Sequence, residues 1–217
     1  WLKDNISNGI IGYDPDLHTS SEIELLEKNL RNDSITLSKT DNLIDIIWTK
    51  QPPCKNNYIL EHKHEYAGKK SLVKCQDITK ILVNEEQQQC VLTDPESISW
   101  LLNIRGNDVP RIPVVQACAI INSVGQVDLF INLNKLKHYS LENLPHVKTH
   151  PFSNFKNHLR ELVGTTRIDY QKTPISIKDC IANYVFCEDP CILPKAIKNP
   201  TELKGTRKAH YRDAVAV

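Results

Sequence analysis

The sequence lacks methionine and is poor in glycine. Its 217 residues include no Met, seven Gly and twelve Pro. This composition excludes collagen-like and low-complexity chains. Because synthesis begins with Met and this chain begins with Trp1, we expect that the original start has been removed and that the chain is a fragment of a longer protein.

An excess of charge of one sign is also missing, as are long apolar runs. There are 27 Lys and Arg against 26 Asp and Glu, so neither a nucleic-acid partner nor a membrane partner is expected. No apolar run approaches the ~20 residues of a membrane helix. Residues 1–10 contain no signal-peptide core. With 40% hydrophobic residues, the chain has the composition of a globular protein.

The cysteines form no recognisable metal or disulfide pattern. Their number is odd and no CxxC occurs, unlike a zinc knuckle or a compact disulfide framework. Reduced thiols, some acting as small hydrophobic core residues, predict a cytoplasmic protein. A redox role would need an activated thiol, which no sequence feature marks. The seven are Cys54, Cys75, Cys90, Cys118, Cys180, Cys187 and Cys191, of which Cys90 and Cys118 stand in apolar stretches.

Helices and short strands alternate along the chain, which predicts an α/β fold. Two apolar runs, 114–121 and 126–131, are joined by a hairpin-like turn. A hairpin brings antiparallel neighbours into the sheet, so we predict a mixed β-sheet flanked by helices. Further strands are expected at 10–15, 34–37, 90–93, 147–150, 167–170 and 184–187, helices at 21–30, 69–83, 95–102, 152–162, 175–182 and from 200 onward, and either state at 42–48.

The polar, proline-containing stretch 49–57 predicts a domain boundary. We therefore expect residues 1–50 to form one unit and residues 51–194 a second. Residues 195–217 would form a linker and a helix.

Two helix starts are marked by their capping residues. Asp94 followed by Pro95 has the pattern of an N-cap with proline at the first helical position. Asn199, Pro200 and Glu202 have the pattern of a capping box, in which Glu202 reaches back to the backbone of Asn199.

Motifs for catalysis or metal binding are scarce. The sequence contains no P-loop, GxSxG, GxGxxG or HExxH pattern. His62, His64 and Glu65 could place two imidazoles near a carboxylate, but the segment is polar and loop-like. We predict no catalytic residue and no metal site in this chain.

One stretch, residues 98–108, combines an apolar helix with charges at its end. Arg105 and Asp108 flank the turn at Gly106. Arg105 could meet the helix dipole while Asp108 pairs with it or caps the turn. Alternatively, Arg105 projects toward a ligand carboxylate or backbone. Both interpretations stay open, and Trp100, Arg105 and Asp108 are candidates for a substrate cleft or an interface.

Several segments together resemble the Xaa-Pro aminopeptidases, members of the creatinase–prolidase group. The order and spacing of these segments match the family along essentially the whole chain. The resemblance implies that 1–50 is the tail of a first domain, that 51–194 is a second creatinase/prolidase N-terminal-like domain, and that 195–217 enters a catalytic domain. The matching segments are IIGYDPDL (10–17), NLIDIIW (42–48), Tyr66-Ala67-Gly68, ISWLLNIRGNDVPRIPV (98–114) and KAIKNPTELKGTRKAHYRDAVAV (195–217).

The resemblance also implies a function for the parent protein. The family removes the N-terminal residue from peptides with proline second, using two divalent metals, usually manganese, held by a third domain. None of those ligands maps onto this chain, which is expected to be inactive alone. Its implied partners are the parent's catalytic domain, the peptide substrate and a second copy in a homodimer. The alternative is a stand-alone interaction or dimerisation module derived from such an enzyme.

Overall fold

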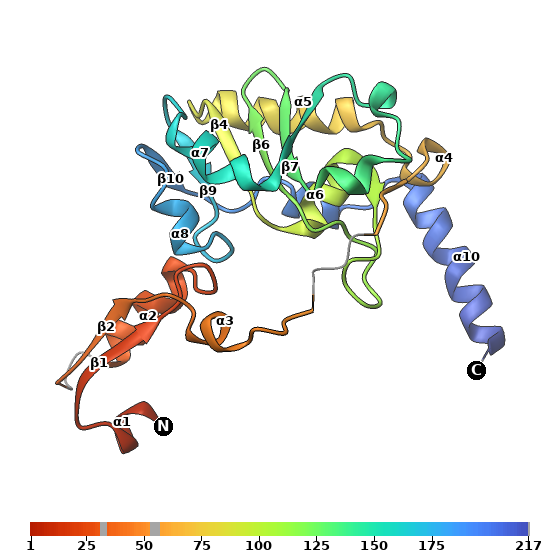
Figure 1. The fold of residues 1–217 in the computed structure, drawn as a ribbon. Coiled ribbons are helices and arrows are strands. Elements are labelled where there is room, and N and C mark those ends of the chain that lie inside the picture. The colour runs from red at the N-terminus through yellow and green to blue at the C-terminus, as the bar shows by residue number, and fades with distance from the viewer. Residues whose placement is uncertain (31–33, 53–56, 217) are drawn as a thin grey trace.

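The computed structural model describes residues 1–30, 34–52 and 57–216. A small N-terminal unit contains a two-stranded sheet, and a larger unit contains a six-stranded mixed sheet (Figure 1). Helix α10 (Pro200–Ala216) extends away from the larger unit. Within the described ranges, no helix is both long enough and apolar enough to cross a membrane.

The N-terminal unit has a β–α–β core. Strands β1 and β2 pair in parallel, with α2 as the crossover between them. Helix α2 buries Ile23 and Leu30 against this small sheet. The expected strands and helix are confirmed, and 42–48 is helical because the Asn42 side chain caps α3. The elements are α1 (Leu2–Asn5), β1 (Asn8–Tyr13), α2 (Ser20–Leu30), β2 (Ser34–Lys39) and α3 (Leu43–Ile47).

The larger sheet has the order β10-β9-β4-β6-β7-β8. Strand β6 is antiparallel to both β4 and β7, whereas the β4–β9, β9–β10 and β7–β8 pairs are parallel. The predicted mixed sheet and hairpin are therefore confirmed. The strands are β4 (Gln89–Leu92), β6 (Cys118–Asn122), β7 (Val127–Ile131), β8 (Val147–Pro151), β9 (Thr166–Ile168) and β10 (Tyr184–Phe186).

Helices cover both faces of this sheet, because successive strand side chains point to opposite sides. Leu129 and Ile131 pack in the core with α5 (Ser71–Asn84) and α6 (Pro95–Leu102). Phe130, between them, packs in a second core with α7 (Phe155–Arg160). The remaining short elements are β3 (Leu60–Glu61), α4 (His64–Ala67), β5 (Ile104–Arg105), η1 (Leu133–Leu136), η2 (Leu141–Asn143), η3 (Phe152–Asn154), α8 (Ile175–Lys178) and α9 (Ile192–Ala196).

Three local predictions need correction. The helix expected over 152–162 begins as a 3₁₀ turn, and α7 ends at Arg160. The helix expected over 175–182 is one short turn, α8. The helix end predicted at 103–106 instead contains β5, which pairs with β3, because Asn103 takes the left-handed conformation and reverses the chain.

The buried thiols confirm the interpretation of the cysteines as core residues. Cys90 and Cys118 are both buried. Burial raises the pKa of Cys118 to about 12, so the protein holds this thiol in its neutral form. Cys54 lies outside the described residues.

The two units meet through polar contacts around α8. The backbone N–H of Ile175 donates to the carbonyl of His18 over 2.9 Å, and that of Ser176 donates to Pro15 over 3.0 Å. The ammonium of Lys156 contacts the carboxylate of Asp16 at 2.7 Å. A further ion pair joins Lys39 to Asp179.

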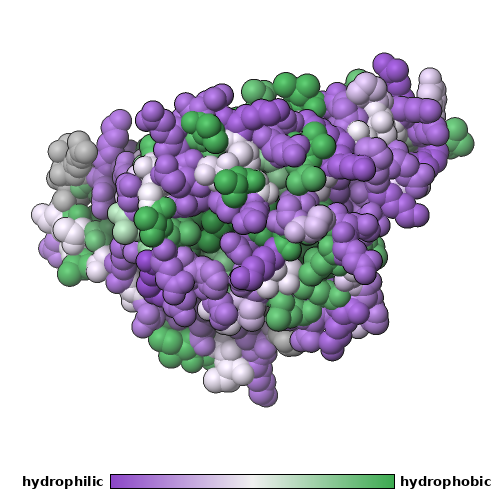
Figure 2. Space-filling model, turned by 90° about the horizontal axis from the view of Figure 1, so that it is seen from above, coloured by the Kyte–Doolittle hydropathy of each residue, from purple (hydrophilic) through white to green (hydrophobic). Residues whose placement is uncertain are grey.

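Hydrophilic side chains cover most of the face seen from above, with hydrophobic side chains scattered among them (Figure 2). No described residue of α10 is buried. A cleft lies between this exposed helix and the larger unit, which is called the second unit below.

Candidate functional site

A cleft of about 850 Å³ lies between α10 and the side of the second unit formed by α4, α6 and β5. Trp100 and Arg105, two of the three residues singled out from the sequence, line this cleft. His62 lines it as well, and burial lowers the pKa of its imidazole. The apolar part of the wall is formed by Tyr66, Trp100, Ile112, Pro113 and Val114.

One side of the cleft is set by the capping box that begins α10. The Asn199 side chain accepts hydrogen bonds from the backbone of Thr201 at 2.9 Å and of Glu202 at 3.0 Å. The Glu202 carboxylate accepts from the backbone of Asn199 at 2.9 Å. The predicted cap is therefore confirmed in both directions.

The same asparagine fastens α10 to the second unit. Its amide nitrogen donates to the carbonyl of Ala67 over 2.8 Å. The adjacent Gly68 has φ +67°, and a Cβ at this position would lie 2.4 Å from the Asn199 side-chain oxygen. The turn at residues 66–68 and the N-terminus of α10 thus form one joint, hereafter the α10 joint.

Arg105 meets the end of α6. Its Nη1 donates to the carbonyls of Ser99 at 3.1 Å and Ile104 at 2.9 Å. This geometry confirms the interpretation that the cation meets the helix C-terminus. Burial lowers the pKa of Arg105, and the negative field of Glu202 opposes that shift. A guanidinium stays charged at any physiological pH.

Asp108 has a different partner from the one considered in the sequence. It forms an ion pair with Lys135 and accepts from the backbone of Gln116 over 2.8 Å. A salt bridge to Arg105 was therefore the wrong pairing, because the loop after Gly106 carries Asp108 to η1. Asp108 is buried beside η1 and is not among the residues that line the cleft.

Sequence reasoning missed Lys74, which contacts Trp100, one of the residues that line the cleft. Its ammonium donates to the carbonyl of Trp100 and to the side chain of Asn103, both over 2.8 Å, and lies 4.3 Å from the Trp100 ring centroid. Burial lowers its pKa to about 8. The available signal was its position on the buried stripe of α5, between Ser71 and Ile78.

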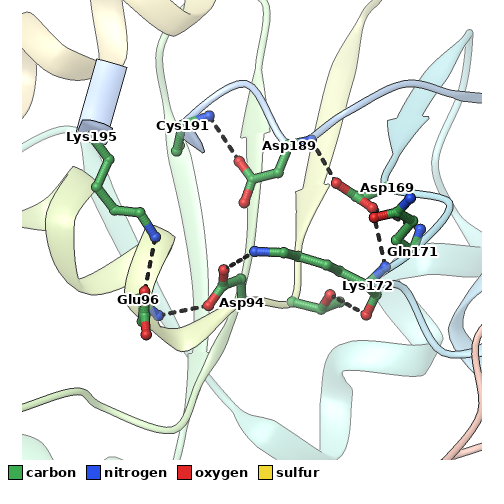
Figure 3. Close-up of polar contacts among 9 residues, drawn as sticks. Asp94, Glu96, Asp169, Gln171, Lys172, Asp189, Cys191 and Lys195 are labelled. Carbon is green, nitrogen blue, oxygen red and sulfur yellow. Dashed lines mark hydrogen bonds and ion pairs between the residues drawn. The ribbon is translucent and has the colours of Figure 1, made fainter. Parts of the chain in front are cut away.

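Carboxylates gather at the carboxyl ends of strands β4, β9 and β10 (Figure 3). Asp169 accepts from the backbone of Asp189, and Asp189 from that of Cys191, both over 2.8 Å. Lys172 pairs with Asp94, whose side chain also caps α6 as predicted, accepting from the backbone N–H two residues on. These contacts tie together the strand-end loops that support α6 and α9.

The described part of the chain contains no group of three or more His, Cys, Asp or Glu that could hold a metal ion. The arrangement at the strand ends therefore holds loops in place and offers no ligand set. His62 and His64 also belong to no such group.

The six-stranded mixed sheet with helices on both faces defines a domain of the creatinase/prolidase N-terminal type. Residues 50–202 match the family described as the Creatinase/Prolidase N-terminal domain. The chain belongs to this family. This match covers the whole six-stranded sheet, the α10 joint and most of the cleft.

The relatives of this chain are named for one activity. "Probable Xaa-Pro aminopeptidase P" of Laccaria bicolor is 32% identical over 95% of this chain and 34% of its own length. "Aminopeptidase P1" of Lotus japonicus is 27% identical over all of this chain and 40% of its own length. The resemblance drawn from the sequence is therefore confirmed. The chain spans little more than a third of these relatives.

A solved structure shows the same fold. The X-prolyl aminopeptidase of Caenorhabditis elegans, described as a cytosolic enzyme with a di-nuclear active site, matches with a TM-score of 0.89 at 24% identity. The match covers all of this chain and 37% of that protein.

Proposed function

We propose that this chain is the non-catalytic N-terminal portion of a metal-dependent Xaa-Pro aminopeptidase. The parent would remove the N-terminal residue from peptides whose second residue is proline. The observation that carries the proposal is α10, which is fastened at its start yet buries no described residue along its length. A helix gains most of its stability from packing one face, so we infer that the parent's catalytic domain covers α10. Relatives named for this activity match the whole chain.

The catalytic metals belong to the rest of the parent. The relative from Caenorhabditis elegans has a di-nuclear active site, which supports two divalent ions, and we propose manganese. The residues described here do not fit such a centre, since they offer no suitable cluster of ligands. We also propose a cytoplasmic location, in keeping with that cytosolic relative and with the buried free thiols.

In this proposal the chain shapes the approach to the active site. Trp100 and Arg105 would face the catalytic domain or the peptide substrate. Asp108 would act indirectly, by holding the loop after Gly106 in place through Lys135.

The proposal is tested on the native protein and on the isolated chain. Antibodies raised against this chain should capture from source cells a species well above 24.8 kDa. That species should release the first residue of a Xaa-Pro tripeptide and lose this activity in EDTA. The isolated chain with added Mn²⁺ should release nothing. Detection of only a chain-sized, inactive species, or hydrolysis by the isolated chain, would contradict the proposal.

A second candidate function is a stand-alone interaction or dimerisation module. Its support is α3, where Leu43, Ile44, Ile46 and Ile47 are all more than half exposed. Exposed apolar surface of this kind favours association. Light scattering should then give a homodimer that Ile44→Glu with Ile47→Glu dissociates. A monomer at high concentration would exclude dimerisation through α3.

A further inference from the structure

We propose that the cleft beside α10 is a docking site for an acidic polypeptide segment, with Arg105 as the anchor for a carboxylate. The proposal goes beyond the aminopeptidase assignment. It concerns the face of α10 that lines the cleft and leaves the other faces of the helix to the parent's catalytic domain. It rests on the charge of the cleft, on the guanidinium of Arg105, which contacts no carboxylate, and on the spacing of the cations along α10.

The cleft concentrates positive charge in a chain that is nearly neutral overall. Six Lys and Arg side chains line it against three Glu, whereas the whole chain has a net charge of +1. Glu96 already pairs with Lys195, and Glu202 is bound to the backbone of Asn199. Among the described residues, no ion pair involves the other five lining cations, which are Arg105, Lys198, Lys204, Lys208 and Arg212.

Two features of Arg105 mark the cleft as a place for an anion. Arg105 lines the cleft, bonds to uncharged acceptors and has no carboxylate in contact. Charges removed from water without a counter-charge are costly, and an incoming carboxylate would recover part of that cost. Two of the five N–H donors of Arg105 serve the carbonyls of Ser99 and Ile104, which leaves three for a ligand.

The spacing along α10 indicates an extended ligand. Lys204, Lys208 and Arg212 are four residues apart and therefore share one face of the helix. At 1.5 Å per residue the row is about 12 Å long. A segment in extended conformation, at about 3.3 Å per residue, would match this length with four residues. The apolar wall at Trp100 and Ile112 would accept the remaining surface of a peptide.

Binding can be measured by fluorescence anisotropy on the 217-residue chain. The probe is a fluorescein-labelled hexaglutamate with an amidated C-terminus, so that only side chains carry carboxylates. Its uncharged counterpart is hexaglutamine with the same label. We expect saturable binding of hexaglutamate at least tenfold tighter than that of hexaglutamine. Arg105→Gln should weaken hexaglutamate binding at least tenfold.

The matched control is Arg160→Gln on α7, which removes the same charge outside the cleft and should leave the Kd unchanged. Because Arg105 also supports α6, circular dichroism verifies the fold of each variant. The triple variant Lys204→Gln, Lys208→Gln and Arg212→Gln removes charges from the exposed helix and leaves Arg105 unchanged. It should weaken hexaglutamate binding to a similar extent.

Three outcomes would overturn the proposal. One is equal affinity for hexaglutamate and hexaglutamine, and another is an equal loss in the Arg160 control. The third is full displacement of hexaglutamate by sulfate at matched ionic strength, which would identify a simple anion site. None of these results bears on whether the parent is an aminopeptidase, which the immunocapture experiment decides separately.

Discussion

Lys135 and Asp108 form an ion pair in the interior of the second unit, with only 5% and 1% of their side chains exposed. The pair joins η1 to the loop after Gly106, and that loop continues into the wall of the cleft at Ile112. A charge buried with its partner is tolerated, whereas a charge left alone in the same place is strongly destabilising.

Removing one member of this pair is expected to lower the free energy of unfolding by about 3–5 kcal/mol. Asp108→Leu leaves the Lys135 ammonium buried without a counter-charge, and Lys135→Met leaves the carboxylate. The double variant removes both charges and should recover most of the loss. Urea denaturation of the four proteins gives the coupling directly. Losses that simply add in the double variant would show that the two groups act independently.

Substitutions of two glycines, one in the α10 joint and one inside α10, test whether the joint holds the helix. Gly68→Ala should loosen α10, because the new methyl group meets the Asn199 side chain and φ is +67°. Gly205→Ala, inside α10 and facing open space, should instead stabilise the helix by about 0.5–1 kcal/mol. Hydrogen exchange over residues 200–216 should therefore accelerate in the first variant and slow in the second. Equal behaviour would show that the joint does not hold the helix.

The polar junction between the units should open when Asp16 is removed. Asp16→Ala deletes the acceptor of Lys156 and Ser176 beside the α8 contact. Since such exposed pairs contribute at most about 1 kcal/mol, amide exchange at Ile175 and Ser176 should accelerate roughly fivefold, without global unfolding. Asp77→Ala is the control, because its ion pairs with Lys69 and Lys80 lie within the second unit. Similar acceleration in the control would contradict a local effect.

The buried thiols predict a loss of stability in alkali. Burial raises the pKa of Cys75 and Cys118 to about 12 from 9.0, so the folded protein keeps protons that the unfolded chain releases above pH 9. Their stabilising contribution is complete below pH 9 and is lost as the pH rises toward 12. Lys74 acts in the opposite direction between pH 8 and 10.5, because burial lowers its pKa to about 8.

Comparison of Cys118→Ala with the unmodified chain isolates one thiol, since Lys74 contributes equally to both. Urea midpoints at pH 8, 9 and 10 should fall less steeply in the variant. The slopes of the unfolding free energy against pH, obtained from the same urea curves, should differ by at most about 1.4 kcal/mol per pH unit, the value for one proton. Parallel curves would show that this thiol ionises alike in both states.

Local features were predictable from the sequence, and distant contacts were not. The caps at Asp94 and Asn199 follow from neighbouring residues, and the structure has both. The partner of Asp108 lies 27 residues away, so only the folded sheet and η1 bring it within reach. The two-residue pairing of β3 with β5 is too short to leave a periodic pattern.

The residues around the cleft show the same difference between local features and distant contacts. Trp100 and Arg105 were recognised because they stand in one unusual stretch of sequence. Lys74 was missed because a lysine within an amphipathic helix ordinarily faces water. The meeting of Gly68 with Asn199 joins segments 131 residues apart, for which the sequence alone holds no physical signal.

The α10 joint has the geometry of a pivot. Asn199, directly before α10, bonds to Ala67, while the helix continues for about 25 Å at 1.5 Å per residue. A rotation of about 10° at Asn199 would therefore move the far end of the helix by about 4 Å. One hydrogen bond to Ala67, and a neighbouring glycine without a side chain, thus set the direction in which α10 leaves the second unit.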